Sequence, residues 1–170
     1  GYDQSMAITT EEFGNAYVTG RFADLVDFDP GPGGDNLGGP GGGGFLSKYS
    51  ANGDYVWARA VVGTIQDYIV DVEVLESGDI VVLGSFSQTS DLNPGGSVAE
   101  FTEAGEGDIF LLSLTTLGDY VWAVAIGATQ WDKPDSIAVD NESGIYVTGT
   151  FSSTVDFDQG PGVAELSESF

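Results

Sequence analysis

The sequence contains no cysteine and no histidine, and only four lysine and arginine residues stand against 27 aspartates and glutamates. Without cysteine there is no disulfide framework and no thiolate nucleophile or metal ligand. Without histidine the commonest general base is missing. The formal net charge of −23 repels phosphate groups and anionic lipids, which argues against nucleic-acid and membrane-surface partners. No apolar run reaches the roughly 20 residues that span a bilayer, so membrane insertion is not expected.

What the chain does contain is an internal repeat of 64 or 65 residues. Trp57 and Trp122 lie 65 positions apart in the similar stretches GDYVWARAVVG and GDYVWAVAIG. A glycine recurs after 64 and then 65 positions within AYVTGRF, IVVLGSF and IYVTGTF, at Gly20, Gly84 and Gly149. Repetition on this scale predicts a fold in which one supersecondary unit is used several times.

Each unit predicts four short β-strands. The first strand is SMAIT, VDVEV or SIAVD, and the glycine-bearing strand follows it after a turn. Next come GFLSKYS (Gly44–Ser50) or IFLLSLT (Ile109–Thr115), and then DYVWARAV or DYVWAVAI. No segment shows a helical period. Four short strands per repeat, with recurring aromatic and glycine positions, are typical of β-propeller blades.

We therefore expect an all-β fold of four-stranded antiparallel, propeller-type blades in tandem. The repeats divide the chain into residues 1–63, 64–127 and 128–170, which is about two and two-thirds units of about 65 residues. Closed propellers need at least about four blades. We expect either an excerpt of a longer tandem array with flanking repeats or copies that self-associate through strand edges into a ring or a filament.

The motifs DSIAVDNESGIYVTGTF (Asp135–Phe151) and IFLLSLTTLGDYVWAVAIG (Ile109–Gly127) resemble the bacterial β-propeller repeats often labelled SBBP, and the resemblance covers nearly the whole chain. It implies a secreted or cell-surface protein with several blades in tandem. It implies no catalytic residues.

An acidic turn recurs in each unit, as VDFDPG, SDLNPG and VDFDQG. Its acids and amide are Asp27 and Asp29, Asp91 and Asn93, and Asp156 and Asp158, with Asp35 and Asn36 as further oxygen donors in the first loop. Paired carboxylates and turn carbonyls suit Ca²⁺, which takes six to eight oxygen ligands. Asp and Asn before a turn also bind nearby backbone amides. The sequence leaves both hypotheses open, a calcium site and a purely turn-forming role.

Two further residues are candidates for surface chemistry. Trp131 lies in a connection between repeats and is a candidate ligand-binding residue for a polysaccharide, although a packing role is the simpler interpretation. Asn141 begins the sequon NES and is a candidate glycosylation site. Trp57 and Trp122 are expected to pack between blades.

The pattern does not predict catalysis. No G-x-S-x-G motif occurs, and the acidic residues recur with the repeat, as structural features do, rather than forming one unique pair. We expect a non-enzymatic, extracellular structural or adhesive module. The alternatives are a carbohydrate-binding, lectin-like propeller that uses its inter-blade loops, and a fragment of a propeller hydrolase.

Overall fold

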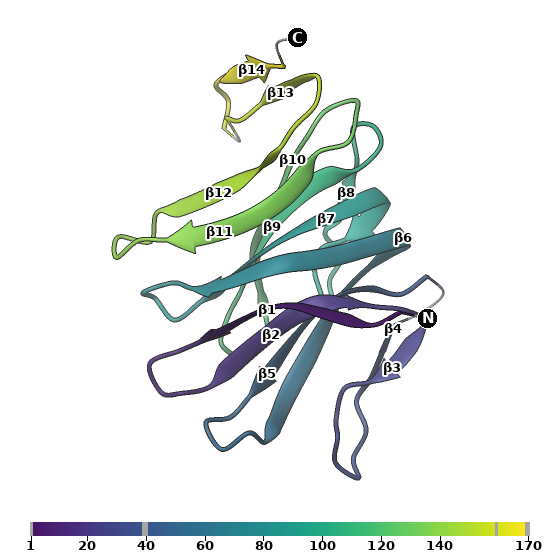
Figure 1. Cartoon of the computed structure of the whole chain (residues 1–170), viewed down its shortest axis with the longest axis vertical. Helices are drawn as coiled ribbons and strands as arrows, with labels where there is room; N and C mark the ends of the chain where they lie inside the picture. The colour runs from purple at the N-terminus through teal and green to yellow at the C-terminus, as the bar shows by residue number, and fades with distance from the viewer. Residues whose placement is uncertain (1, 39–40, 159, 169–170) are drawn as a thin grey trace.

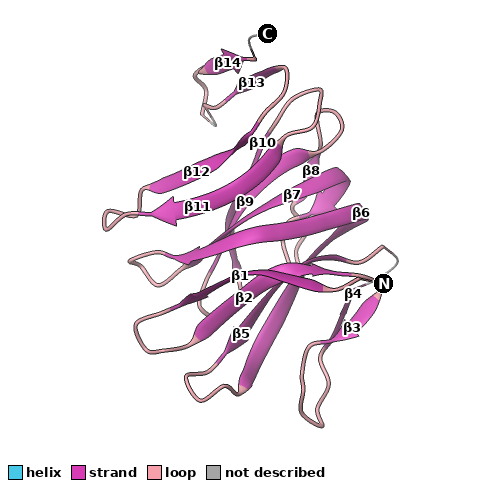
Figure 2. Cartoon of the chain, viewed as in Figure 1, coloured by secondary structure: helices cyan, strands magenta, loops and turns pink. Residues whose placement is uncertain are grey.

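The computed structural model describes residues 2–38, 41–158 and 160–168, and all regular secondary structure within these ranges is β-strand. Figure 2 shows the strands and the loops that connect them. The described ranges contain no helix that could cross a membrane. The all-β prediction is confirmed.

The first repeat forms a four-stranded antiparallel sheet. Its strands, in hydrogen-bonding order, are β1 (Gln4–Thr10), β2 (Ala16–Phe22), β5 (Gly43–Tyr49) and the first part of β6 (Tyr55–Val74). Strand β6 pairs with β5 as far as Val61 and, from Val62, with β7 (Ile80–Asp91). It is therefore shared by two successive sheets, and the expected repeat boundary at residues 63 and 64 falls inside it.

The second repeat forms a similar sheet from the rest of β6, β7, β9 (Asp108–Leu114) and β10 (Tyr120–Ile126). The third contributes β11 (Lys133–Val139) and β12 (Ile145–Thr150), which pair with each other. In Figure 1, β1 and β2 lie on one side of β6, and β11 and β12 lie on the other. This stack of antiparallel blades is the propeller-like architecture that the repeat predicts.

The second blade is buried on both faces. Ile80, Val82 and Phe86 of β7 belong to a core shared with the first blade, and Val81 and Leu83 belong to a core shared with the third blade. All five are fully buried. Because successive side chains of a strand point to opposite faces, an unbroken apolar run is what a strand between two packed layers requires.

Two of the four basic residues hold the first blade to the second. The turn between β9 and β10 presents three backbone carbonyl groups, those of Thr116, Leu117 and Gly118. Lys48 Nζ donates to Thr116 O at 3.2 Å, and Arg59 donates to Leu117 O at 3.2 Å and to Gly118 O at 3.0 Å. Cationic donors thus satisfy carbonyl groups that face the neighbouring blade.

The recurring glycine lies opposite a β-bulge in the first strand of each unit. A Cβ atom at Gly20, Gly84 or Gly149 would lie 1.9, 2.4 or 2.4 Å from the carbonyl oxygen of Gln4, Tyr68 or Lys133, respectively. Only glycine allows the two strands to approach so closely, which explains its recurrence.

The two repeated tryptophans differ in burial. Trp57 is 8% exposed, belongs to the core between the first and second blades, and donates from Nε1 to Thr116 O at 3.3 Å. Trp122 packs against the second core but is only partly buried. The prediction of burial between blades is thus confirmed for Trp57 and only partly met by Trp122, because the described third repeat places two strands, not four, against the second blade.

Replacing Trp57 by Ala should reduce the free energy of unfolding by about 3–5 kcal/mol, since it removes a buried indole from the core between two blades. The Trp122→Ala change is the matched control and should cost less, because part of its ring is already in water. Urea unfolding followed by circular dichroism measures both changes. Equal losses for the two variants would contradict this picture of the packing.

Candidate functional site

The acidic residues of each repeat lie at the tip of a short hairpin that sequence reasoning did not predict. The hairpin strands are β3 (Leu25–Asp27) with β4 (Asn36–Gly38), the end of β7 with β8 (Glu100–Thr102), and β13 (Thr154–Asp156) with β14 (Glu165–Ser167). The two strands of each hairpin pair in the same register. In all three, the first acid of the turn lies opposite the first residue of the second strand.

The same three hydrogen bonds recur in each acidic turn. In the first, Asp27 Oδ1 accepts from the amides of Asp29 and Asp35 at 3.1 and 2.7 Å, and Asp29 Oδ1 accepts from the amide of Gly31 at 2.7 Å. Asp91 and Asn93 make the equivalent bonds in the second turn, and Asp156 and Asp158 make them in the third. Each first acid therefore closes the loop by binding amides two and eight residues further on.

The acids stabilise their turns by accepting hydrogen bonds from backbone amides, and this role requires no metal ion. Asn93 accepts the amide of Gly95 at 2.8 Å, much as Asp29 and Asp158 accept theirs, so a negative charge is not needed at that position. Within the described ranges, no group of three or more acidic side chains is arranged to hold a metal ion. Asp35 accepts a hydrogen bond from the hydroxyl group of Tyr55.

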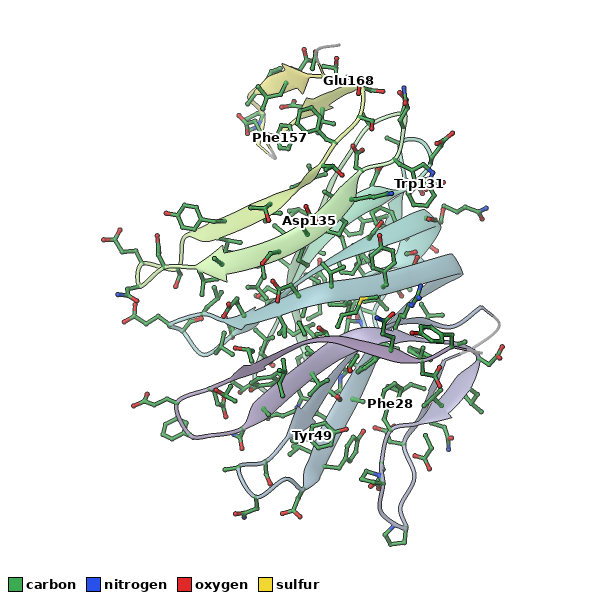
Figure 3. All side chains as sticks on the ribbon, viewed as in Figure 1. Phe28, Tyr49, Trp131, Asp135, Phe157 and Glu168 are labelled. Carbon is green, nitrogen blue, oxygen red and sulfur yellow. The ribbon has the colours of Figure 1, made fainter. Side chains whose placement is uncertain are left out.

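The residue between the two acceptor side chains packs each turn against apolar side chains. Phe28 lies 5.5 Å from Phe22 and 5.0 Å from Phe45, centroid to centroid. Leu92 occupies the same position in the second turn and is fully buried. Phe157 occupies it in the third, 5.3 Å from Phe151, and is 39% exposed. Figure 3 shows Phe157 near β13 and β14.

A second set of recurring acids escaped sequence reasoning. Asp3, Asp67 and Asp132 are spaced by 64 and 65 residues, and each accepts the amide of the residue 20 positions further on. The distances are 2.9, 3.2 and 3.0 Å. The repeat period could have revealed these acids. A search for every aspartate that recurs after 64 or 65 residues, and not only for those beside Pro and Gly, would have found them.

Burial changes the ionisation of Asp67, the second of these acids, and of Asp108. Asp67 is 2% exposed, and its burial raises its pKa from 3.8 to about 6, against the lowering effect of hydrogen bonds from Ser90 Oγ and the Ser87 amide. Burial also raises the pKa of Asp108, and the nearby negative charges of Asp132 and Glu103 add to that rise. The hydrogen bonds described for Asp67 and Asp108 come from backbone amides and a serine hydroxyl group.

Trp131 lies over the backbone of Gly107, where an added Cβ would meet its ring at 2.9 Å. The amide of the next residue, Asp132, donates to Gly107 O at 3.0 Å, which fixes this approach. The indole is nevertheless 45% exposed and lies at the margin of the molecule in Figure 3. It combines the expected packing role with a free surface that a ligand could reach.

Asn141 is exposed and lies at the rim of a cavity of about 510 Å³. The turns between the first two strands of all three repeats converge here, and acidic side chains line the cavity: Glu11, Glu12, Glu76 and Asp140. Glycosylation at Asn141 stays a prediction.

One long edge of β12 has no paired strand among the described residues. Strands β2 and β7 each have a paired strand on both sides, whereas within the described ranges β12 pairs only with β11. Beneath this edge lies a cavity of about 380 Å³, walled by apolar residues of the second and third blades, namely Ile109, Ile126, Val147, Phe151, Phe157 and Leu166.

Comparison with known proteins finds a distant similarity to a repeat protein. No protein-family model matches the chain. An uncharacterized WD repeat-containing protein, L264, of Acanthamoeba polyphaga mimivirus is 22% identical over 134 residues, which cover 72% of this chain and 10% of that protein. The chain therefore spans about a tenth of the length of this curated relative. The similarity is consistent with a propeller-like repeat fold.

Replacing Asp67 by Asn should remove a pH dependence of stability. The folded protein keeps Asp67 protonated up to about pH 6, whereas the unfolded chain ionises near 3.8, so wild-type stability should fall as pH rises between these values. A shift of about two pKa units corresponds to at most about 3 kcal/mol.

Thermal melting of wild type, Asp67→Asn and the exposed control Glu76→Gln at pH 4 to 7 measures this effect. Wild type should lose stability relative to Asp67→Asn across the window, while Glu76→Gln should follow wild type. Parallel curves for all three proteins would show that Asp67 ionises as readily in the folded as in the unfolded state.

Proposed function

We propose that the chain is a non-enzymatic structural module of propeller blades whose open edge at β12 is covered either by flanking repeats of a longer chain or by another copy of the module. The observation that carries the proposal is the free edge of β12 above an apolar cavity, where the equivalent strands β2 and β7 are covered by β5 and β9. An unpaired strand edge is a template for another strand. The repeated acids support the non-enzymatic part, because they are engaged by backbone amides in the same way three times.

The setting that we propose is extracellular or cell-surface, with an adhesive or structural role. Its support is the resemblance of the repeat to the SBBP-type bacterial sequences. The absence of cysteine leaves stability to packing and to ions. We propose further that Ca²⁺ stabilises the module at the acidic turns, since each turn combines carboxylate or amide oxygens with a Gly-rich loop in a chain of net charge −23.

A lectin-like function is the second candidate, and one observation favours it. Trp131 exposes 45% of its surface in an inter-blade connection, as a sugar-stacking residue would. Binding on a glycan array that is lost in Trp131→Ala, with unchanged melting, would favour this function over the structural one.

Association through the β12 edge predicts concentration-dependent growth in mass by light scattering. Salt or Ca²⁺ should promote it by screening repulsion between chains of charge −23. The Val147→Lys variant places a charge in the apolar cavity under the edge and should remain monomeric. The control Val98→Lys adds the same charge at a 72% exposed site and should associate like wild type. A wild-type chain that stays monomeric in high salt and Ca²⁺ contradicts association between copies.

Calcium stabilisation has a separate readout in the melting temperature. The temperature should rise with Ca²⁺ and fall in excess chelator, because an ion bound only by the folded state stabilises by mass action. Asp156→Asn keeps an acceptor oxygen for the turn and should reduce the calcium response. A melting curve that chelator leaves unchanged assigns the acidic turns a turn-forming role alone.

A further inference from the structure

The second and third blades meet along two segments that carry acids outside the acidic turns. Residues 103–107 lead into β9, and residues 127–132 lead into β11. The Asp132 amide donates to Gly107 O at 3.0 Å, and the ring of Trp131 lies against Gly107. The two segments are therefore packed side by side at the boundary between the blades.

Asp108, the first residue of β9, carries a buried carboxylate that is only half satisfied. The residue is 3% exposed, and Oδ2 accepts the Ala104 amide at 2.9 Å, but within the described ranges Oδ1 has no hydrogen-bond partner. Oε2 of Glu103, the residue before Ala104, is also buried without a partner among the described residues. Because a buried polar atom without a partner is destabilising, folded proteins retain few of them. These two oxygens therefore need an explanation.

The fold of a blade does not require an acid at this position. Gly43 holds the position of Asp108 in the first blade, and Val62 holds the position of Gly127. A Cβ at Gly43 would lie 3.3 Å from Cγ2 of Val62, and a Cβ at Gly127 would lie 2.3 Å from Oδ1 of Asp108. Each pair thus consists of a glycine and a side chain that lies against it. Because a valine fills this space in the first blade, the carboxylate in the second blade serves a purpose other than packing.

Asp132 adds negative charge to the same place. It is 1% exposed, and its two oxygens accept the amides of Ser152 and Ala128 at 3.0 and 2.8 Å. Within the described ranges, none of Glu103, Asp108 and Asp132 forms an ion pair with a lysine or arginine. Burial and, next to it, the charges of Asp132 and Glu103 raise the pKa of Asp108. The boundary therefore combines uncompensated negative charge with two free carboxylate oxygens.

These surroundings do not depend on the free edge of β12. The groups described around Asp108 come from residues 103–107 and 127–132. In the complete second blade, Asp67 holds the position of Asp132, and its described hydrogen bonds come from β6 and β7. The third strand of that blade supplies none of these bonds, so a third strand beside β12 would leave the two free oxygens as they are.

We propose that Glu103 and Asp108 bind a Ca²⁺ ion at the boundary between the second and third blades. Ca²⁺ accepts carboxylate, carbonyl and water oxygens in flexible geometry, so two carboxylate ligands completed by carbonyl groups and water suit it. Asp132 is held by amides and contributes charge rather than a ligand. This agrees with the finding that no three acidic side chains of the described ranges are arranged around one ion.

The inference goes beyond the proposed function, because it does not depend on association through β12 or on calcium in the acidic turns. The first acid of each turn already accepts two amides with one oxygen, whereas Oδ1 of Asp108 accepts none. An ion at Asp108 would hold residues 103–107 against residues 127–132 and so join one blade to the next.

The test is Tb³⁺ luminescence of the full 170-residue chain, since Tb³⁺ replaces Ca²⁺ at oxygen sites and is sensitised by a nearby indole. Trp131, labelled in Figure 3, borders the site through Gly107. Excitation of the tryptophans should give saturable luminescence that Ca²⁺ displaces. Trp131→Phe should reduce the luminescence, while calorimetry should show unchanged Ca²⁺ affinity. Asp108→Asn should weaken binding by at least about tenfold, the lower limit seen even for residues that only support a metal ligand.

A double variant guards against loss of folding. Asp108→Gly with Gly127→Val reproduces the pair found in the first blade, so it should fold and yet show no Trp131-sensitised luminescence. Glu76→Gln, which removes one acid at the other end of β7, is the matched control and should bind like wild type.

Three results overturn the inference. The first is wild type without saturable luminescence. The second is a calcium response that Asp156→Asn abolishes and Asp108→Asn retains, which places the ion in the acidic turns. The third is Asp108→Asn with a higher melting temperature and unchanged Ca²⁺ affinity, which shows that a proton, not a metal ion, satisfies Asp108. Association measured by light scattering is independent of all three, so the proposed function and this site can fail separately.

Discussion

Burial of the second blade on both faces is the constraint on which the other features depend. A strand has two faces, and β7 and β9 are apolar on both, so neither can be stable without a layer on each side. The first blade covers one face and β11 with β12 covers the other. One repeat alone could not bury its own apolar surface, and the chain therefore repeats the unit.

The shared strand β6 links the blades and fixes their relative positions. It leaves the first sheet at Val61 and enters the second at Val62 without a loop. Lys48 and Arg59 then hold the turn between β9 and β10 from the side of the first blade. These two residues are half of the basic side chains in the molecule, and both serve the contact between blades. The acids of the turns are used differently, as acceptors for amides within their own repeat. Asp71 instead accepts from the Ser136 hydroxyl group and the Ile137 amide, which links the second repeat to the third.

The period was the strongest signal in the sequence. It predicted four-stranded blades and the burial of Trp57, and it located the acidic turns. It did not predict the hairpins that carry those turns, because strands of three residues have no detectable pattern. The buried acids Asp67 and Asp132 were missed, since a single Asp within a strand or just before one has no local signature of burial. The continuity of β6 was not predicted either, because DYVWARAV and VDVEV were expected to be two separate strands.

The candidate site was harder to predict than the fold. Trp131 and the acidic turns drew attention by composition, whereas the free edge of β12 depends on which strands pair. The edge became evident when the neighbours and the burial of three equivalent glycines, Gly20, Gly84 and Gly149, were compared in the structure. The comparison was informative because two copies are covered and the third is open.

Amide hydrogen exchange measured by mass spectrometry tests the central claim most directly. If the second blade is buried between its neighbours, peptides from β7 and β9 should exchange slowest, while peptides from β12 should exchange far faster than those from the equivalent strand β2. Protection of β12 in the free monomer equal to that of β2 and β7 would contradict the architecture and the open edge together.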